Sequence, residues 1–303
     1  MTKVLSIGEC MVELSHIDAR TLRMGFAGDT YNTAVYLRRV AGELELDVEV
    51  GYLTGLGIDD YSAQMRHEWL ADSIVDHSIL IDDGLPGVYA IRTDEAGERR
   101  FSYWREQSAA RRVFRGTDWC RRISGDIVHL SGITLQLTTG AARSALIARL
   151  RELRTAGCRV SFDTNYRPRA WPSPSDAMDA IDDLCGVADI VLASRDDETL
   201  LRGAGSPEEL VGLICAFGPT EVVLRAGPAG AYVHSEGRTA HVPAAPVERV
   251  VDTTAAGDAF AGAYLAARLG NRVAATTIQY PGALTPRDLR LADDEAQHRA
   301  QHT

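Results

Sequence analysis

Short apolar runs alternate with amphipathic stretches along most of the chain. The runs typical of buried strands lie at residues 4–9, 48–57, 126–132, 159–165, 189–194 and 221–227. Between them lie helical patterns such as residues 139–157, which start with polar residues and end at Gly157, a natural helix C-terminal residue. This alternation predicts a mostly parallel central sheet covered by helices on both faces, in a three-layer α/β/α arrangement.

One region departs from this pattern. Residues 87–106 alternate apolar and polar positions with period two around a glycine-containing turn, which predicts an antiparallel hairpin. Together with residues 11–28, the hairpin is expected to form a small sheet beside the main domain. A substrate then binds between this small sheet and the carboxyl ends of the parallel strands, where α/β folds usually hold ligands.

Composition restricts the classes of partner. The 303 residues are 45% apolar and carry a net charge of −10, which argues against nucleic acid or an anionic membrane as the main partner. An anionic small substrate remains compatible, because a local arginine cluster can outweigh a distributed negative charge. With no apolar span of membrane length, no signal-peptide pattern and five scattered cysteines, the chain is expected to be cytoplasmic with free thiols.

The candidate chemistry lies at residues 252–258, DTTAAGD, which lead directly into an apolar helix. A helix N-terminus exposes unpaired N–H groups and a partial positive charge, and the small residues Ala255, Ala256 and Gly257 let an anion approach the backbone. A carboxylate fixed there, Asp258, suits phosphoryl transfer to an alcohol. The alternative is that Asp258 only caps the helix and that the small residues allow tight packing.

Other catalytic motifs are missing from the sequence. There is no GxxxxGK[ST] loop of P-loop kinases, no GxGxxG after the first strand and no GxSxG elbow of hydrolases. The histidines have no zinc-ligand spacing, so no zinc site is predicted.

Four stretches together resemble the ribokinase-like (PfkB) carbohydrate kinases: DTTAAGD, FAGDTYNTAVYLRR, EVVLRAGPAGAYV and SRDDE. Within that family, the segments IGECMVELS, PGVYAIRTDEAGERRFSYWREQSAAR and FDTNYRPRAWPS are most similar to 2-keto-3-deoxygluconate (2-dehydro-3-deoxygluconate) kinases. The resemblance spans essentially the whole chain. It implies one ribokinase-like domain over 1–303, a lid formed by about 10–27 and 87–106, and a nucleotide-binding part at about 190–290.

The resemblance implies ATP and Mg²⁺ as cofactors and phosphorylation of the 6-hydroxyl of the sugar acid, with Asp258 as general base and homo-oligomers formed through the lid sheet. The implied substrate ligands are Gly28, Asp29, Asn32, Tyr89, Tyr103, Arg105, Arg167 and Asp258. The implied nucleotide ligands are Asn165, Arg167, Ser194, Arg225, Gly227, Gly230, Ala255, Ala256, Gly257 and Asn271. The carboxylates implied to act indirectly on the metal are Asp197 and Asp252.

Several of these residues also have a possible structural role that involves no ligand. Asn165 is equally suited to capping the backbone at a strand end, and Tyr89 and Tyr103 to packing of the lid. Arg105 and Arg167 are favoured as ligands because both match substrate-contact positions of the resembling kinases, and guanidinium groups can pair bidentately with a planar carboxylate. The segment after residue 269 is about a dozen residues shorter than in the resembling kinases. The assignment of Asn271 as a nucleotide ligand depends on how this segment aligns with theirs.

Two rival functions remain at this level. The nearer is another PfkB kinase, acting on fructose or a related deoxy-keto acid. The farther is a sugar-acid-binding protein without catalysis, suggested by the short segment after residue 269. Release of ADP in the presence of substrate separates these alternatives.

Overall fold

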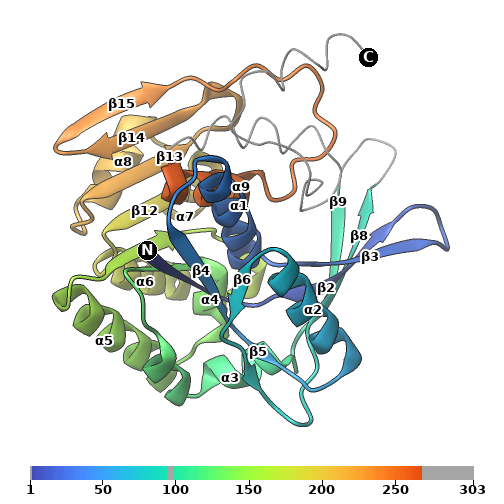
Figure 1. Cartoon of the computed structure of the whole chain (residues 1–303). Helices are drawn as coiled ribbons and strands as arrows, with labels where there is room; N and C mark the ends of the chain where they lie inside the picture. The colour runs from blue at the N-terminus through green and yellow to red at the C-terminus, as the bar shows by residue number, and fades with distance from the viewer. Residues whose placement is uncertain (1, 94–98, 268–303) are drawn as a thin grey trace.

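The computed structural model describes residues 2–93 and 99–267, which build a large sheet between two helical layers and a small sheet beside it (Figure 1). The large sheet is parallel from β13 to β6, and β14 and β15 continue it antiparallel. Its strands, in order across the sheet, are β15 (Arg238–Val242), β14 (Ala231–Ser235), β13 (Glu221–Arg225), β12 (Ile190–Ser194), β11 (Arg159–Asp163), β10 (Ile127–Ser131), β1 (Thr2–Ile7), β4 (Val48–Leu53) and β6 (Ile74–Asp76). The predicted mostly parallel sheet is confirmed.

Helices cover both faces of this sheet. The face with Val160, Phe162 and Leu224 packs against α3 (Ala109–Arg115), α4 (Gly132–Leu137), α5 (Ala141–Thr155), α6 (Pro174–Cys185), α7 (Arg195–Arg202) and α8 (Pro207–Cys215). The opposite face packs against α1 (Asp29–Glu43), α2 (Asp60–Ala71) and α9 (Ala256–Ala267). Shorter elements are the strand pair β5 (Gly55–Leu56) and β7 (Ile79–Leu80) and the 3₁₀ turns η1 (Asp118–Arg122), η2 (Pro168–Ala170) and η3 (Gly227–Ala229). No helix in the described part of the chain is long and apolar enough to cross a membrane.

The small sheet has the order β3 (Leu22–Ala27), β2 (Met11–His16), β8 (Val88–Thr93) and β9 (Arg99–Trp104). It joins the early segment to the hairpin, as the alternation predicted, and it stands to one side of the large sheet (Figure 1). On one of its faces Met11, Tyr89 and Ile91 are buried, and Ala255, just before α9, packs against them. This lid sheet therefore faces the start of α9.

The helices α1 and α9 lie side by side and approach unusually closely (Figure 1). A Cβ atom placed on Gly262 lies 2.5 Å from the carbonyl oxygen of Thr33, well inside normal contact distance. The small residues of α9 therefore do allow tight packing, the alternative to anion binding that the sequence left open. That packing has a further effect, because it brings the first turns of α1 and α9 together.

The N-termini of the helices differ in a way that matters for the site. Six helices start on a Ser or Asp whose side chain accepts a backbone N–H: Asp59, Ser108, Ser131, Ser173, Ser194 and Ser206. By contrast, α1 follows Gly28 and α9 follows Ala255, neither of which has a capping side chain. In α9, where the Ala256 amide donates to the Thr253 carbonyl, the amides of Gly257 and Asp258 are thus left for other acceptors.

Candidate active site

Asp258 lies in the first turn of α9 and is held by a residue from α1. The side-chain amide of Asn32 donates a hydrogen bond of 2.8 Å to its carboxylate. Burial and the negative charge of Asp29 raise the pKa of Asp258 to about 7, while the hydrogen bond from Asn32 and the charge of Arg225 act in the opposite direction. A carboxylate with this pKa can accept a proton near neutral pH.

Asp29 is the second carboxylate of the site and starts α1. Its carboxylate accepts a hydrogen bond of 2.9 Å from the side-chain amide of Asn165, which follows β11 with a φ of 32°. Burial raises the pKa of Asp29, and the charge of Asp163 adds to that effect. Asn32 and Asn165 therefore each hold one of two mutually repelling carboxylates.

Arg225 connects the sheet to the start of α9. Its guanidinium donates to the carbonyls of Ala193 at 3.2 Å and Gly257 at 2.8 Å, and to the Asp163 carboxylate at 2.8 Å. Its side chain is 13% exposed, and the ion pair with Asp163 is almost wholly buried. In this structure Arg225 positions the first turn of α9, which carries Asp258, while its contact with nucleotide remains a prediction.

The turn before α9 has strained geometry. Ala255 has a φ of 59°, a region that side chains other than glycine rarely adopt. The amide of Ala256 donates to the carbonyl of Thr253 at 3.3 Å, so it is already engaged. The amides of Gly257 and Asp258 occupy first-turn positions that have no acceptor within the helix. A Cβ on Gly257 would lie 3.0 Å from the Arg225 guanidinium, which accounts for the glycine there.

The lid contributes an arginine and two tyrosines. Arg105, just after β9, pairs with the buried carboxylate of Glu9. Tyr89 is buried and donates to Glu13, and Tyr103 lies opposite Tyr89 with the two ring centroids 5.8 Å apart.

Charges from the lid sheet and from the large domain both affect the pKa of Tyr103. Partial burial raises the pKa of Tyr103, the charges of Arg105 and Arg167 lower it, and Asp29 raises it. The lid, Asp29 and both predicted arginines thus surround one region.

Arg167 and Asp197 form an ion pair at the same edge of the sheet. Their closest atoms are 3.3 Å apart, and the Arg167 side chain is 52% exposed. Ser194 caps α7 by accepting the amide of Asp197 at 3.1 Å, and Asp252 accepts the amide of Thr254 at 2.8 Å. Within the described residues no group of three or more His, Cys, Asp or Glu side chains could hold a metal by itself.

The predicted glycines have steric roles. A Cβ on Gly28 would lie 2.1 Å from the carbonyl oxygen of Glu9, so α1 starts against the loop after β1. Gly227 and Gly230 have φ values of 55° and 94° in the turn between β13 and β14. Asn271 lies outside the described residues.

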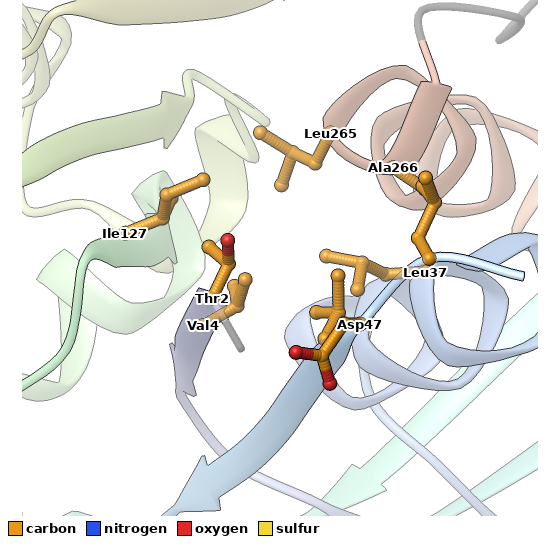
Figure 2. Close-up of a pocket in the computed structure, with 9 residues that line it drawn as sticks. Thr2, Val4, Leu37, Asp47, Ile127, Leu265 and Ala266 are labelled. Carbon is orange, nitrogen blue, oxygen red and sulfur yellow. The ribbon is translucent and has the colours of Figure 1, made fainter. Parts of the chain in front are cut away.

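A cavity of about 480 Å³ opens between the start of β1, the last turn of α9 and the segment that follows α1 (Figure 2), and Asp258 does not line it. Its lining is Thr2, Val4, Leu37, Leu46, Asp47, Val48, Ile127, Leu265 and Ala266. These walls are mostly apolar and sit at the amino ends of the parallel strands. The lining has one carboxylate, Asp47, but no arginine and no helix N-terminus, so the cavity does not suit phosphoryl transfer.

Comparison with known proteins agrees with this geometry. Residues 1–289 match the family described as pfkB family carbohydrate kinase. The chain belongs to that family. It is 41% identical over 300 residues to a 2-dehydro-3-deoxygluconokinase of Dickeya dadantii (strain 3937), covering 92% of this chain and 96% of the relative. It is 39% identical over 306 residues to a 2-dehydro-3-deoxygluconokinase of Escherichia coli (strain K12), covering 94% and 98%.

A solved structure has the same fold. The fructokinase from Vibrio cholerae O395 in fructose, ADP and calcium ion bound form is 23% identical, with a TM-score of 0.81 and coverage of 99% of this chain and 98% of that one. The predicted ribokinase-like α/β/α fold and the carbohydrate-kinase activity are therefore confirmed. The roles of the individual site residues remain predictions, and all of these residues except Asn271 have positions in the described structure.

Sequence reasoning missed three buried acids of the site region. Glu9 holds Arg105, Glu13 holds Tyr89, and Asp163 holds Arg225. Each lies in a strand or directly after one, where an acidic residue in an otherwise apolar run is unusual. That contrast was the available signal, but it could not name the partners.

Proposed function

We propose that this carbohydrate kinase transfers the γ-phosphoryl group of ATP to the 6-hydroxyl of 2-keto-3-deoxygluconate, giving 2-keto-3-deoxy-6-phosphogluconate. The observation that carries the chemistry is the Asp258 carboxylate, held by Asn32 in the first turn of α9. The 6-oxygen attacks the γ-phosphorus, the bond from that phosphorus to the bridging oxygen of ADP breaks, and the hydroxyl proton passes to Asp258.

The start of α9 supports stabilisation of the transferred group. The amides of Gly257 and Asp258 have no acceptor within the helix, and the helix end carries a partial positive charge, so both favour a developing negative charge at this position. Gly257 and Asp258 are themselves held in place, because Arg225 binds the Gly257 carbonyl and Asn32 binds the Asp258 side chain. The donors are therefore organised before the substrate arrives.

The residues present also fit a phosphate-bound Mg²⁺. This ion is usually held by one or two carboxylates, waters and substrate phosphates rather than by a full protein cage. Asp197 and Asp252 would supply carboxylate oxygens of this kind, acting indirectly through water. When bound, Mg²⁺ offsets the negative charge of the phosphates.

The choice of a sugar acid rests on two supports. The relatives at 39–41% identity carry the name 2-dehydro-3-deoxygluconokinase. In addition, the charges of Arg105 and Arg167 both lower the pKa of Tyr103. Two guanidinium groups therefore lie near the lid in a protein of net charge −10. A carboxylate is the substrate group that such a pair binds best.

The test is a coupled assay of ADP release with 2-keto-3-deoxygluconate, fructose, ribose and adenosine. Highest kcat/KM on the sugar acid supports the proposal, and preference for a neutral sugar favours the fructokinase-like alternative. No substrate-dependent ADP release supports the binding-protein alternative.

For the mechanism, Asp258→Asn should lower kcat by on the order of 10²- to 10⁴-fold. Asp176→Asn is the matched control, because Asp176 is also the third residue of its helix, α6, but is far from the lid. If Asp258→Asn keeps more than a tenth of kcat (roughly 1.4 kcal/mol of barrier), Asp258 is not the base.

We also propose that the protein forms homo-oligomers through the lid and resides in the cytoplasm. Strand β9 is an edge strand, and Phe101, Tyr103 and Trp104 on it are all exposed. Such a strand is suited to pairing with a second copy. The five cysteines form no disulfide, which suits a reducing compartment. Light scattering of the wild type and of Trp104→Arg tests the assembly, and a wild-type monomer contradicts it.

A further inference from the structure

Glu9 is a buried acid whose only charged partner in the described structure is the predicted substrate arginine. It lies in the loop between β1 and β2, and its side chain is 1% exposed. One carboxylate oxygen accepts the hydroxyl of Ser108, and the other pairs with Arg105. A carboxylate this deeply buried is costly unless it is paired, so the arrangement needs a reason.

The surroundings of Glu9 leave it little freedom. A Cβ on Gly87 would lie 2.9 Å from the Glu9 carboxylate and 3.1 Å from the Cβ of Arg105. The backbone of Glu9 is in turn covered by Gly28 at the start of α1. Ser108, the cap of α3, donates to the carboxylate oxygen that the arginine does not contact. Glu9 is therefore fixed by three separate elements.

Arg105 has donors that Glu9 does not satisfy. Its side chain is 15% exposed, and its Nε atom is buried without a hydrogen-bond partner in the described structure. The charge of the guanidinium also acts to lower the pKa values of Asp29 and Tyr103, so the group lies near these two site residues. The guanidinium is thus anchored by Glu9 on one side, and the exposed part of the side chain stays open to a ligand.

We infer that Glu9 is a positioning residue, which orients the Arg105 guanidinium to bind the carboxylate of the sugar-acid substrate. This rests on the proposed function, because a substrate carboxylate must be present for the orientation to matter. Fixing a long arginine side chain before binding saves the conformational entropy that the substrate otherwise has to offset. Glu9 also balances the arginine charge when no substrate is bound.

The principal test is Glu9→Gln, assayed with 2-keto-3-deoxygluconate, ATP and fructose. The loss of a charge-assisted contact should raise KM for the sugar acid about tenfold. The values of kcat and of KM for ATP should stay within about twofold, a difference below 0.5 kcal/mol. In an Arg105→Ala background, Glu9→Gln should have no further effect on that KM, because the oriented group is gone.

Controls separate positioning from stability. Glu221, at the amino end of β13, is another buried glutamate and accepts a hydrogen bond from Tyr264. The Glu221→Gln variant should lower Tm without changing KM for the sugar acid. If Glu9→Gln does not fold, Ser108→Ala replaces it, since it keeps the ion pair but frees the carboxylate; KM should then rise about two- to threefold.

The outcomes are distinct. Equal KM values in Glu9→Gln or Ser108→Ala and the wild type overturn the inference, as does an undiminished effect of Glu9→Gln without Arg105. A wild-type enzyme that prefers fructose instead overturns the proposed function.

Discussion

The ionisation of Asp258 makes the pH dependence of turnover the most direct test of the site. With a pKa of about 7, this carboxylate is about one-tenth ionised at pH 6 and about one-hundredth ionised at pH 5. A general base works only when ionised, so kcat at saturating ATP and sugar acid should fall about tenfold per pH unit below neutrality. An aspartate at its ordinary pKa of 3.8 gives no such fall above pH 5.

The structure also names the groups that set this pKa. Burial raises it first, then the charges of Asp29 on α1 and Asp163 on β11, while Asn32 and Arg225 lower it. Asp29→Asn removes one negative charge with little change of shape, and the new amide oxygen can still accept the hydrogen bond from Asn165. The acid limb of the profile should therefore move to lower pH.

The assay is initial-rate ADP release from pH 5 to 9 at constant ionic strength. At pH 6 the Asp29→Asn variant should keep a larger fraction of its own plateau rate than the wild type does, whatever happens to the plateau itself. A wild-type profile that is flat down to pH 5 refutes the raised pKa. An acid limb at the same pH in both proteins refutes the role of Asp29.

Three further predictions concern stability and packing. Folding raises the pKa of Asp258, so the protonated form favours the folded state, and this stability is lost as pH rises toward about 7. Asp258→Asn should therefore raise Tm at pH 8 more than at pH 5. An equal change of Tm at both pH values contradicts this. Gly262→Ala should lower the free energy of unfolding by about 1–3 kcal/mol, and should lower kcat because it separates α1 from α9. The control is Gly212→Ala in α8, where a Cβ meets nothing within 4 Å; in denaturant melts it should be neutral or stabilising. Ala255→Gly should keep turnover and leave stability within about 1 kcal/mol, because relief of the left-handed strain offsets the extra chain entropy, while Ala255→Val should reduce both.

The local features of this protein followed from its sequence. The apolar runs predicted the parallel strands, and the period-two alternation predicted the lid hairpin, because both patterns reflect which side chains one element buries. The position of Asp258 at the start of a helix was equally visible, since the small residues and the apolar run stand next to each other in the chain. Tight packing and an anion-binding helix start were offered as alternatives, and the structure contains the close packing at Gly262 together with the uncapped first turn.

Tertiary structure decided which partner each functional side chain has. Asn32 binds Asp258 across 226 positions of sequence, and only the close approach of α1 and α9 makes that contact possible. Arg225 holds the first turn of α9 through the Gly257 carbonyl, and Glu9 holds Arg105 from the loop between β1 and β2. A sequence pattern reports the burial of each element separately. Contacts between side chains, and the ionisation they set, depend on how those elements pack against one another.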